Sequence, residues 1–411
     1  MTKGADRKNT YGDAAADAKI KMRINAAEAE LFADEELRRR RMGRRERTLV
    51  TMGILVVVVY FVCIFLPDNV ALNADYHSFA WYVDMTGRNI SVFAGWLGGD
   101  EQSSARFHAT QYIIVALVGM ALSVSGAVYQ GAFRNALASP STLGVQTGGA
   151  LGGTIFVLLF YEPSDEITFA LDAARGAGVL DRYGRSLFIL AGCFVMVGLV
   201  LLAAKRMSRG GRLSTIGLIL SGMVFGGAVG SILGLIRYYM LLNNTEDARA
   251  YALRYVMMGT FDYTYTPTHL LFIGLPVAVC TIIVMVLRKR LNLLAFGEDE
   301  ARTMGVNVGL TRTLTIAVVT VMTAIVISFC GMIGFIGFMT PHVVRRMVGP
   351  DFNYLLPGSG LFGAIIMMVI FHIGKAVGLA STIGIMTSLV GGSVFMGILI
   401  YYRRRGHADW A

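Results

Sequence analysis

The sequence predicts an all-α protein that crosses a membrane many times, and three observations support this fold class. Hydrophobic residues make up 55% of the 411 residues and charged residues only 16%, whereas a soluble domain carries about 25% charged residues. Apolar stretches of roughly 18 to 25 residues, the length that spans a bilayer as a helix, separate short charged blocks. The net charge of +10 lies mostly in the flanks of these stretches, which indicates membrane topology rather than nucleic-acid binding.

Ten apolar stretches are long enough to be membrane-spanning elements. We expect them to be helices, because lipid offers no hydrogen-bond partner to open backbone groups. Their predicted ranges are 49–66, 112–131, 143–161, 186–204, 214–236, 268–287, 313–330, 331–347, 358–374 and 382–402. Because the number is even, the chain ends on the side of the membrane on which it begins.

Charge placement orients these spans. Lys and Arg mark cytoplasmic flanks, and the basic clusters lie at 38–47, 205–212, 288–290 and 403–405. The segments assigned to the outer side carry many of the acidic residues and cover 67–111, 162–185 and 237–267. We therefore expect a multi-pass protein of the cell membrane with both termini in the cytoplasm.

The polar N-terminal region is expected to be a separate extension. Residues 1–48 contain hardly any core-forming side chains, so a cytoplasmic and partly disordered segment is predicted. This charged region is also far longer than the n-region of a secretory signal. Residues 49–411 are predicted to form the transmembrane domain.

Two places interrupt the helical pattern. Gly331, Gly334 and Gly337 are followed by Pro341, a pattern that predicts two short elements instead of one continuous helix. A second interruption is predicted after residue 236, where polar residues precede an apolar run that does not clearly resume. Broken helices are tolerated in membranes only where they are buried or line a water-filled path, so both places are candidates for a translocation route.

A glycine ridge marks the fifth span. Gly222, Gly226, Gly230 and Gly234 recur at a spacing of four, which places them on one helix face. Close helix packing explains most such ridges. The alternative interpretation is a smooth wall for a large solute.

The sequence lacks the groups that membrane enzymes and self-powered carriers use. No Asp or Glu falls within the ten predicted spans, although ion-coupled carriers usually place an ionisable or carbonyl-rich site at mid-membrane. A phosphate-binding loop, a zinc-hydrolase motif and a nucleophile elbow are all missing, and the four cysteines show no metal spacing. We expect no catalytic and no metal site, so uphill transport would need a partner as its energy source. A stand-alone secondary transporter stays open as the alternative.

One cytoplasmic loop, 296–310, has the composition of a partner-binding helix. The acidic run Glu298, Asp299 and Glu300 favours a helix N-terminus, and Gly305 is a suitable C-terminal stop. Ala301, Met304 and Val308 would provide a modest apolar face.

Several ordered motifs between about residue 108 and residue 405 resemble those of a known family. The matching positions include Gln130, Arg134 and Asn135 in 126–144; Gly297, Glu298, Ala301, Met304 and Gly305 in the loop above; and Gly331, Pro341, His342 and Arg345 in 331–345. The chain resembles the FecCD-family permeases of iron-siderophore, heme and vitamin B12 ATP-binding-cassette (ABC) importers.

The resemblance implies a type II ABC importer permease of about ten spans in a bacterial cytoplasmic membrane. It implies a second permease copy or paralogue, two ATPase subunits that hold ATP-Mg, and a solute-binding protein outside, with no cofactor on this chain. Ferric siderophore is the expected cargo, and heme and cobalamin are the alternatives. The five loop residues Gly297, Glu298, Ala301, Met304 and Gly305 would couple to the ATPase. Gln130, Arg134, Asn135, Gly222, Gly226 and Gly230 would line the translocation path.

The chain departs from the family pattern at its outer surface. His108 to Gln111 stand where the family has paired arginines, which resemble a docking contact for the binding protein. Arg106 and Lys375 are the positive charges expected to serve this docking instead. The departures suggest one member of an unequal permease pair or an unusual binding protein, and the sequence does not select the exact cargo.

Overall fold

The computed structural model describes residues 42–65, 104–160, 179–207, 215–243, 253, 256–261 and 267–404. These residues form helices and their connections, and no strand occurs among them. The chain divides into two compact units, Met1–Thr51 and Met52–Ala411. In the first unit only residues 42–51 are described, all of them helical. The predicted extension before residue 42 therefore lies outside the described residues.

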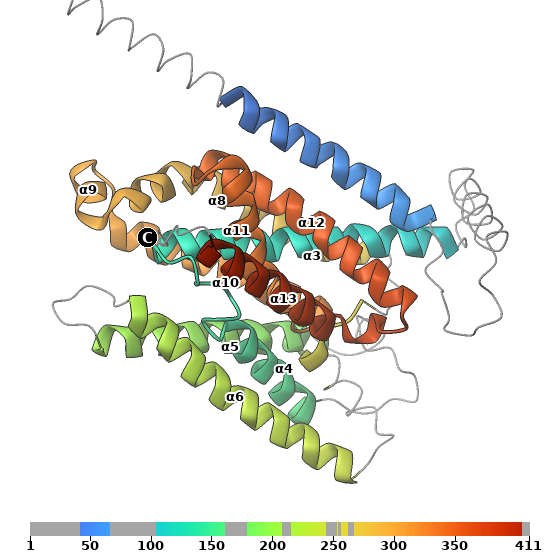
Figure 1. Cartoon of the computed structure of the whole chain (residues 1–411). Coiled ribbons are helices and arrows are strands. Elements are labelled where there is room, and N and C mark those ends of the chain that lie inside the picture. The colour runs from blue at the N-terminus through green and yellow to red at the C-terminus, as the bar shows by residue number, and fades with distance from the viewer. Residues whose placement is uncertain are drawn as a thin grey trace, which may run out of the picture. The chain divides into compact units, whose positions relative to one another are not determined.

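The helices follow one another in the order shown in Figure 1. After the helix Met42–Phe65, they are α3 (Ser104–Ala132), α4 (Val145–Phe160), α5 (Val179–Arg206), α6 (Thr215–Asn243), α8 (Pro267–Phe296), α9 (Glu298–Thr303), α10 (Val308–Cys330), α11 (Ile336–Val348), α12 (Phe352–Ala376), η2 (Ala380–Thr382) and α13 (Ile383–Arg404).

Each of the ten predicted spans coincides with one of these helices, which confirms an all-α membrane fold. Among the described residues, eight helices are long and apolar enough to cross a membrane. The other two are shorter, since α4 has 16 residues and α11 has 13. The predicted span 331–347 begins too early, because Gly331 and Phe335 adopt φ values of 70° and 62° and helix α11 starts only at Ile336.

Helix α3 is the central element of the second unit. It packs against α8, α10, α11 and α12, and glycines allow the closest approaches. A Cβ atom at Gly119 would lie 2.3 Å from the carbonyl oxygen of Gly363 in α12, and one at Gly126 would meet Gly337 in α11. Such backbone contact is the usual means of tight helix packing in membranes. Helices α4, α5 and α6 pack against one another, and α4 and α5 also contact α10 (Figure 1).

The predicted interruption after residue 236 is wrong. Helix α6 continues without a break to Asn243, because Arg and Tyr side chains are compatible with helix formation and no Gly or Pro lies between 235 and 243. The chain is instead non-helical at 259–261, where Gly259 has a φ of 64°.

Candidate functional site

The loop 296–310 forms the short helix α9, with ends at the positions that its sequence predicts. Gly297 precedes it with φ 151° and ψ 158°, a conformation that essentially only glycine adopts. Gly305 follows with φ 81°, and its N–H donates to the carbonyl of Arg302. Ala301 is fully buried, whereas Met304 is 54% exposed. The predicted apolar face is therefore divided between the protein core and the surface.

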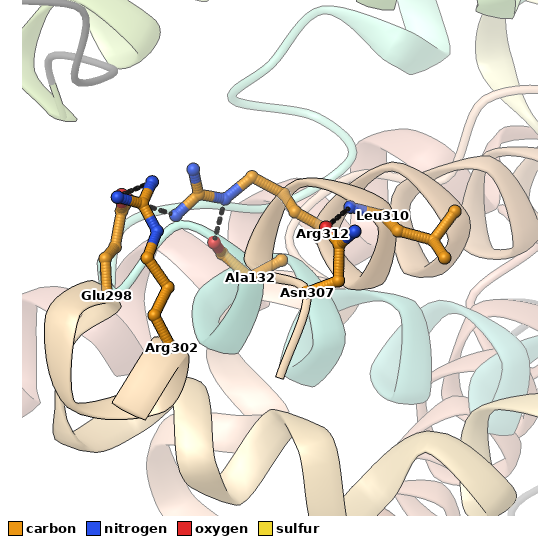
Figure 2. Close-up of polar contacts among 6 residues, drawn as sticks. All are labelled: Ala132, Glu298, Arg302, Asn307, Leu310 and Arg312. Atoms are coloured by element: carbon orange, nitrogen blue, oxygen red, sulfur yellow. Dashed lines mark hydrogen bonds and ion pairs between the residues drawn. The ribbon is translucent and has the colours of Figure 1, made fainter. Parts of the chain in front are cut away.

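Arg312 of α10 connects α9 to another helix, as Figure 2 shows. Its Nη2 donates to Oε1 of Glu298 at 2.5 Å, and its Nε donates to the carbonyl oxygen of Ala132, the last residue of α3, at 2.9 Å. The side chains of Arg312 and Glu298 are only 13% and 21% exposed. One half-buried guanidinium thus joins α9, α10 and α3.

Arg312 was not predicted from the sequence. On a helix, a spacing of four residues brings charges together, and this rule selects Arg302 as the partner of Glu298. In the structure Arg302 lies 4.0 Å from Glu298 and is 64% exposed, so it forms the weaker pair. Arg312 reaches the same carboxylate across the turn between α9 and α10, and local spacing cannot indicate such a contact.

The connections on both sides of α9 are fixed by side-chain amides. The Oδ1 of Asn307 accepts a hydrogen bond from the N–H of Leu310 at 3.0 Å and caps α10. Near the end of α8, Asn292 donates to Asp351 at 2.8 Å and accepts from the N–H of Phe352. Asp351 is the N-cap of α12, so the α8–α9–α10 connection is attached to α12 as well as to α3.

The three residues near the end of α3 that are predicted to line the translocation path have different environments. Gln130 is buried; its Nε2 donates to the carbonyl of Phe338, and its Oε1 accepts from Arg345 at 3.0 Å. Arg134 is exposed and has a φ of 50°, and the Oδ1 of Asn135 accepts from the N–H of Leu137. Gln130 therefore joins two of the motifs, whereas Arg134 and Asn135 form the turn after α3.

The predicted helix break between α10 and α11 is confirmed, and the second non-helical segment lies against it. The N–H of Thr260 donates to the carbonyl of Cys330 at 2.9 Å, and the N–H of Met332 donates to the carbonyl of Val256 at 3.1 Å. From α4, Gln146 donates to the carbonyl of Ile333 at 2.7 Å. These partners satisfy the backbone groups that a broken helix leaves open, so both breaks are stable features of the fold.

The glycine ridge of α6 divides into a packed half and an open half. A Cβ atom at Gly222 would lie 2.3 Å from the carbonyl oxygen of Thr142, and one at Gly226 would be 3.5 Å from Cα of Gly144. Gly230 and Gly234 have no atom of the described residues within 4 Å of the Cβ position. Only the first half of the ridge therefore packs within the chain.

The two predicted docking residues occupy helix ends. Arg106 lies in the first turn of α3, and its side chain is outside the described residues. Lys375 lies in the last turn of α12, with its Nζ atom 5.7 Å and 5.9 Å from the ring centroids of Phe371 and Tyr112. Gln111, at a family arginine position, is buried and donates to the carbonyl of Phe261 at 2.5 Å. Its side chain therefore belongs to the helix packing and not to the surface.

The part of the chain that the structure describes holds no group of three or more His, Cys, Asp or Glu side chains able to bind a metal. The four cysteines are all buried, and none of them forms a disulfide bond. The site consists of an exposed short helix, α9, which Arg312 links to the end of α3, while Asn292 links the preceding helix α8 to the start of α12. Such an arrangement is suited to passing a movement between elements.

Comparisons with known proteins agree with this architecture. A profile of the FecCD transport family matches residues 85–401. The chain is 33% identical over 288 residues to the cobalamin import system permease protein BtuC of Halobacterium salinarum, a match that covers 70% of each chain. It is 32% identical over 296 residues to the molybdate import system permease protein MolB of Haemophilus influenzae, with 72% of this chain and 80% of that protein covered.

Two further comparisons cover almost the whole of the matched protein. The hemin transport system permease protein HmuU of Yersinia pestis is 26% identical over 367 residues, or 89% of this chain and 99% of that protein. A solved structure described as a metal-chelate type ABC transporter in an inward-facing conformation superimposes with a TM-score of 0.65 at 26% identity, covering 87% of this chain and 99% of that chain. The ordered motifs, the helical architecture and these matches show that the chain belongs to the FecCD transport family of ABC importer permeases.

Proposed function

We propose that this chain is the membrane subunit of an importer that moves a ferric siderophore inward, with ATP-Mg bound and hydrolysed by a partner ATPase. No covalent chemistry is assigned to the chain itself. The predicted lack of an acidic group in the spans supports an external energy source. Both termini face the cytoplasm in this proposal, because the basic clusters flank the spans on that side.

The single observation that carries the ATPase partnership is the structure of α9. Its Ala301 is buried, whereas Phe296, Met304 and Leu310 around it are 70%, 54% and 58% exposed. A six-residue helix is too short to be stable alone, yet here it is held by the ion pair of Glu298 with Arg312 and is flanked by Gly297 and Gly305, both at positive φ. A firmly held helix with outward apolar side chains is a suitable surface for another protein.

A second permease copy is proposed to cover the open half of the α6 ridge. Gly227, Gly230 and Gly234 allow a close backbone approach, and no described residue fills the space over them. In this arrangement the solute path would run beside α6. An identical second copy would make the permease a homodimer, and a paralogue would make it a heterodimer.

The proposed cargo is a ferric siderophore, with heme and cobalamin as alternatives. The similar proteins are named for cobalamin, molybdate and hemin, and the similar structure for a metal chelate. Each of these named solutes contains a metal, either in a chelate or in an oxyanion. A binding protein outside, reached through Arg106 and Lys375, would select among them.

The test is reconstitution of the chain with its candidate ATPase and binding protein in liposomes. Uptake of a labelled ferric siderophore that requires internal ATP supports the proposal. Hemin, cobalamin and molybdate are offered in parallel, and preference for one of them would replace the proposed cargo. Uptake by the chain alone under a proton or sodium gradient would favour the secondary-transporter alternative.

A further inference from the structure

Helix α9 has no packing contact with α3. Among the described elements it contacts only its neighbours in sequence, α8 and α10. The polar link to α3 is made by the Arg312 guanidinium, which binds Glu298 of α9 and the carbonyl of Ala132, 180 positions away in the chain (Figure 2). Movement of Glu298 would therefore change the force on the end of α3 through this one side chain.

The end of α3 leads directly to α6. Residues 133–144 follow Ala132 and connect α3 to α4. Within this connection, the carbonyl oxygen of Thr142 and Cα of Leu143 lie 2.3 Å and 2.8 Å from the position that a Cβ atom at Gly222 of α6 would occupy. The 133–144 connection thus joins Ala132 covalently to backbone atoms that contact α6, so a displacement of Ala132 would move them.

We infer that Arg312 is a positioning residue that transmits movement of α9 to α3 and to the connection that contacts α6. The inference rests on the proposed role of α9 as the ATPase-binding helix. Arginine is suited to this role, because its planar fork donates from Nε and Nη in different directions at once. The carbonyl that it binds belongs to the last residue of α3. The carbonyls of Tyr129, Gln130 and Gly131 already accept backbone N–H groups of the turn that follows, and a cation is favourable at this end of a helix.

A purely local role is the competing explanation. In that case the ion pair with Glu298 would only keep α9 folded, and the bond to Ala132 would be incidental. The two explanations differ for a lysine at 312. Lysine retains the positive charge for Glu298. Its three donors all lie on one terminal nitrogen, however, which cannot occupy the Nε and Nη2 positions of the arginine at the same time.

The experiment uses the full complex of permease, ATPase and binding protein in liposomes. It measures the affinity for the ATPase, the ATP hydrolysis rate and the amount of cargo taken up per ATP. For Arg312→Lys we expect ATPase affinity within about twofold of wild type and uptake per ATP lowered at least about tenfold, the effect of losing a hydrogen bond to a charged group. The matched control is Arg206→Lys, the same substitution at an exposed arginine in the last turn of α5, and it leaves uptake per ATP unchanged.

A charge exchange separates the two contacts of Arg312. Combining Glu298→Arg with Arg312→Glu restores the ion pair, but a carboxylate at 312 cannot donate to the carbonyl of Ala132. We expect ATPase binding to recover relative to Arg312→Glu alone, while uptake per ATP stays low. Wild-type uptake per ATP in the exchange variant or in Arg312→Lys would overturn the inference.

Failure of the proposed function and failure of the inference about Arg312 alone give different results. If the wild-type chain binds no ATPase, or binds it equally well with Ala301→Leu, then α9 is not the binding helix and the inference fails together with the proposed function. If Ala301→Leu weakens ATPase binding but Arg312→Lys keeps full coupling, only the inference about Arg312 is wrong.

Discussion

A pair of glycine substitutions in α6 separates packing within the chain from contacts with other molecules. In Gly222→Leu, the new Cβ would fall 2.3 Å from the carbonyl oxygen of Thr142 and 2.8 Å from Cα of Leu143. Both atoms belong to the backbone, so α6 or the 133–144 connection must move by roughly 1 Å to reach ordinary contact distance. Overpacking of this kind costs about 1–3 kcal/mol. In Gly230→Leu, no described residue lies within 4 Å of the new Cβ, and this cost is not expected.

The assay measures thermal unfolding of the monomeric protein in detergent and uptake by the reconstituted complex. Gly222→Leu is expected to lower the apparent Tm by several degrees and to reduce uptake. Gly230→Leu is expected to keep the monomer Tm within experimental error but to lower uptake, because its side chain would occupy the face that we propose for a second copy and the solute path. Equal Tm values for Gly222→Leu and wild type would refute the packing argument. Full uptake by Gly230→Leu would remove the open half of the ridge from the proposed path.

Three further predictions concern α9, the helix break and the outer surface. Gly297→Ala should weaken ATPase binding in a pull-down assay by roughly five- to a hundredfold, because alanine at this φ and ψ costs about 1–3 kcal/mol; unchanged binding would show that α9 tolerates another backbone conformation. Gln146→Leu should lower the detergent Tm, because losing the donor leaves the buried carbonyl of Ile333 without that partner, at about 1–3 kcal/mol; a Tm equal to that of wild type would contradict this role of Gln146. Reversing Arg106 and Lys375 together to Glu should slow binding-protein association chiefly at low salt and leave basal ATPase activity unchanged, because rim charges act mainly on association rate; identical kinetics by surface plasmon resonance would exclude them from docking.

Local patterns accounted for most of the secondary structure. A long apolar run must become a helix in lipid, so all ten predicted spans coincide with helices of the structure. The acidic start and the Gly305 stop likewise located α9, because both act within one turn. The prediction failed after residue 236, where polarity was interpreted as a break although α6 continues to Asn243. Polarity affects where a helix lies in a membrane but does not by itself end the helix.

The glycine ridge shows where sequence periodicity reaches its limit. Spacing alone placed Gly222, Gly226 and Gly230 on one face of α6. Spacing could not indicate that Gly222 contacts the 133–144 connection whereas no described residue lies against Gly230. That difference depends on where the connection passes α6 in the tertiary structure. Gln111 gives a second example, since its position suggested a surface contact, but the structure places it in a buried hydrogen bond with Phe261.

The sequence by itself thus determined that the chain is helical, where its apolar helices lie, where the break between α10 and α11 falls and which loop forms α9. These properties depend on length, polarity and residue type within a few turns of helix. Only the tertiary structure decided that Arg312 bonds to both Glu298 and Ala132 and that Gln130 accepts from Arg345. The physical reason is that the partners Ala132 and Gln130 lie 180 and 215 positions from Arg312 and Arg345, and only helix packing brings such distant polar groups within hydrogen-bond distance.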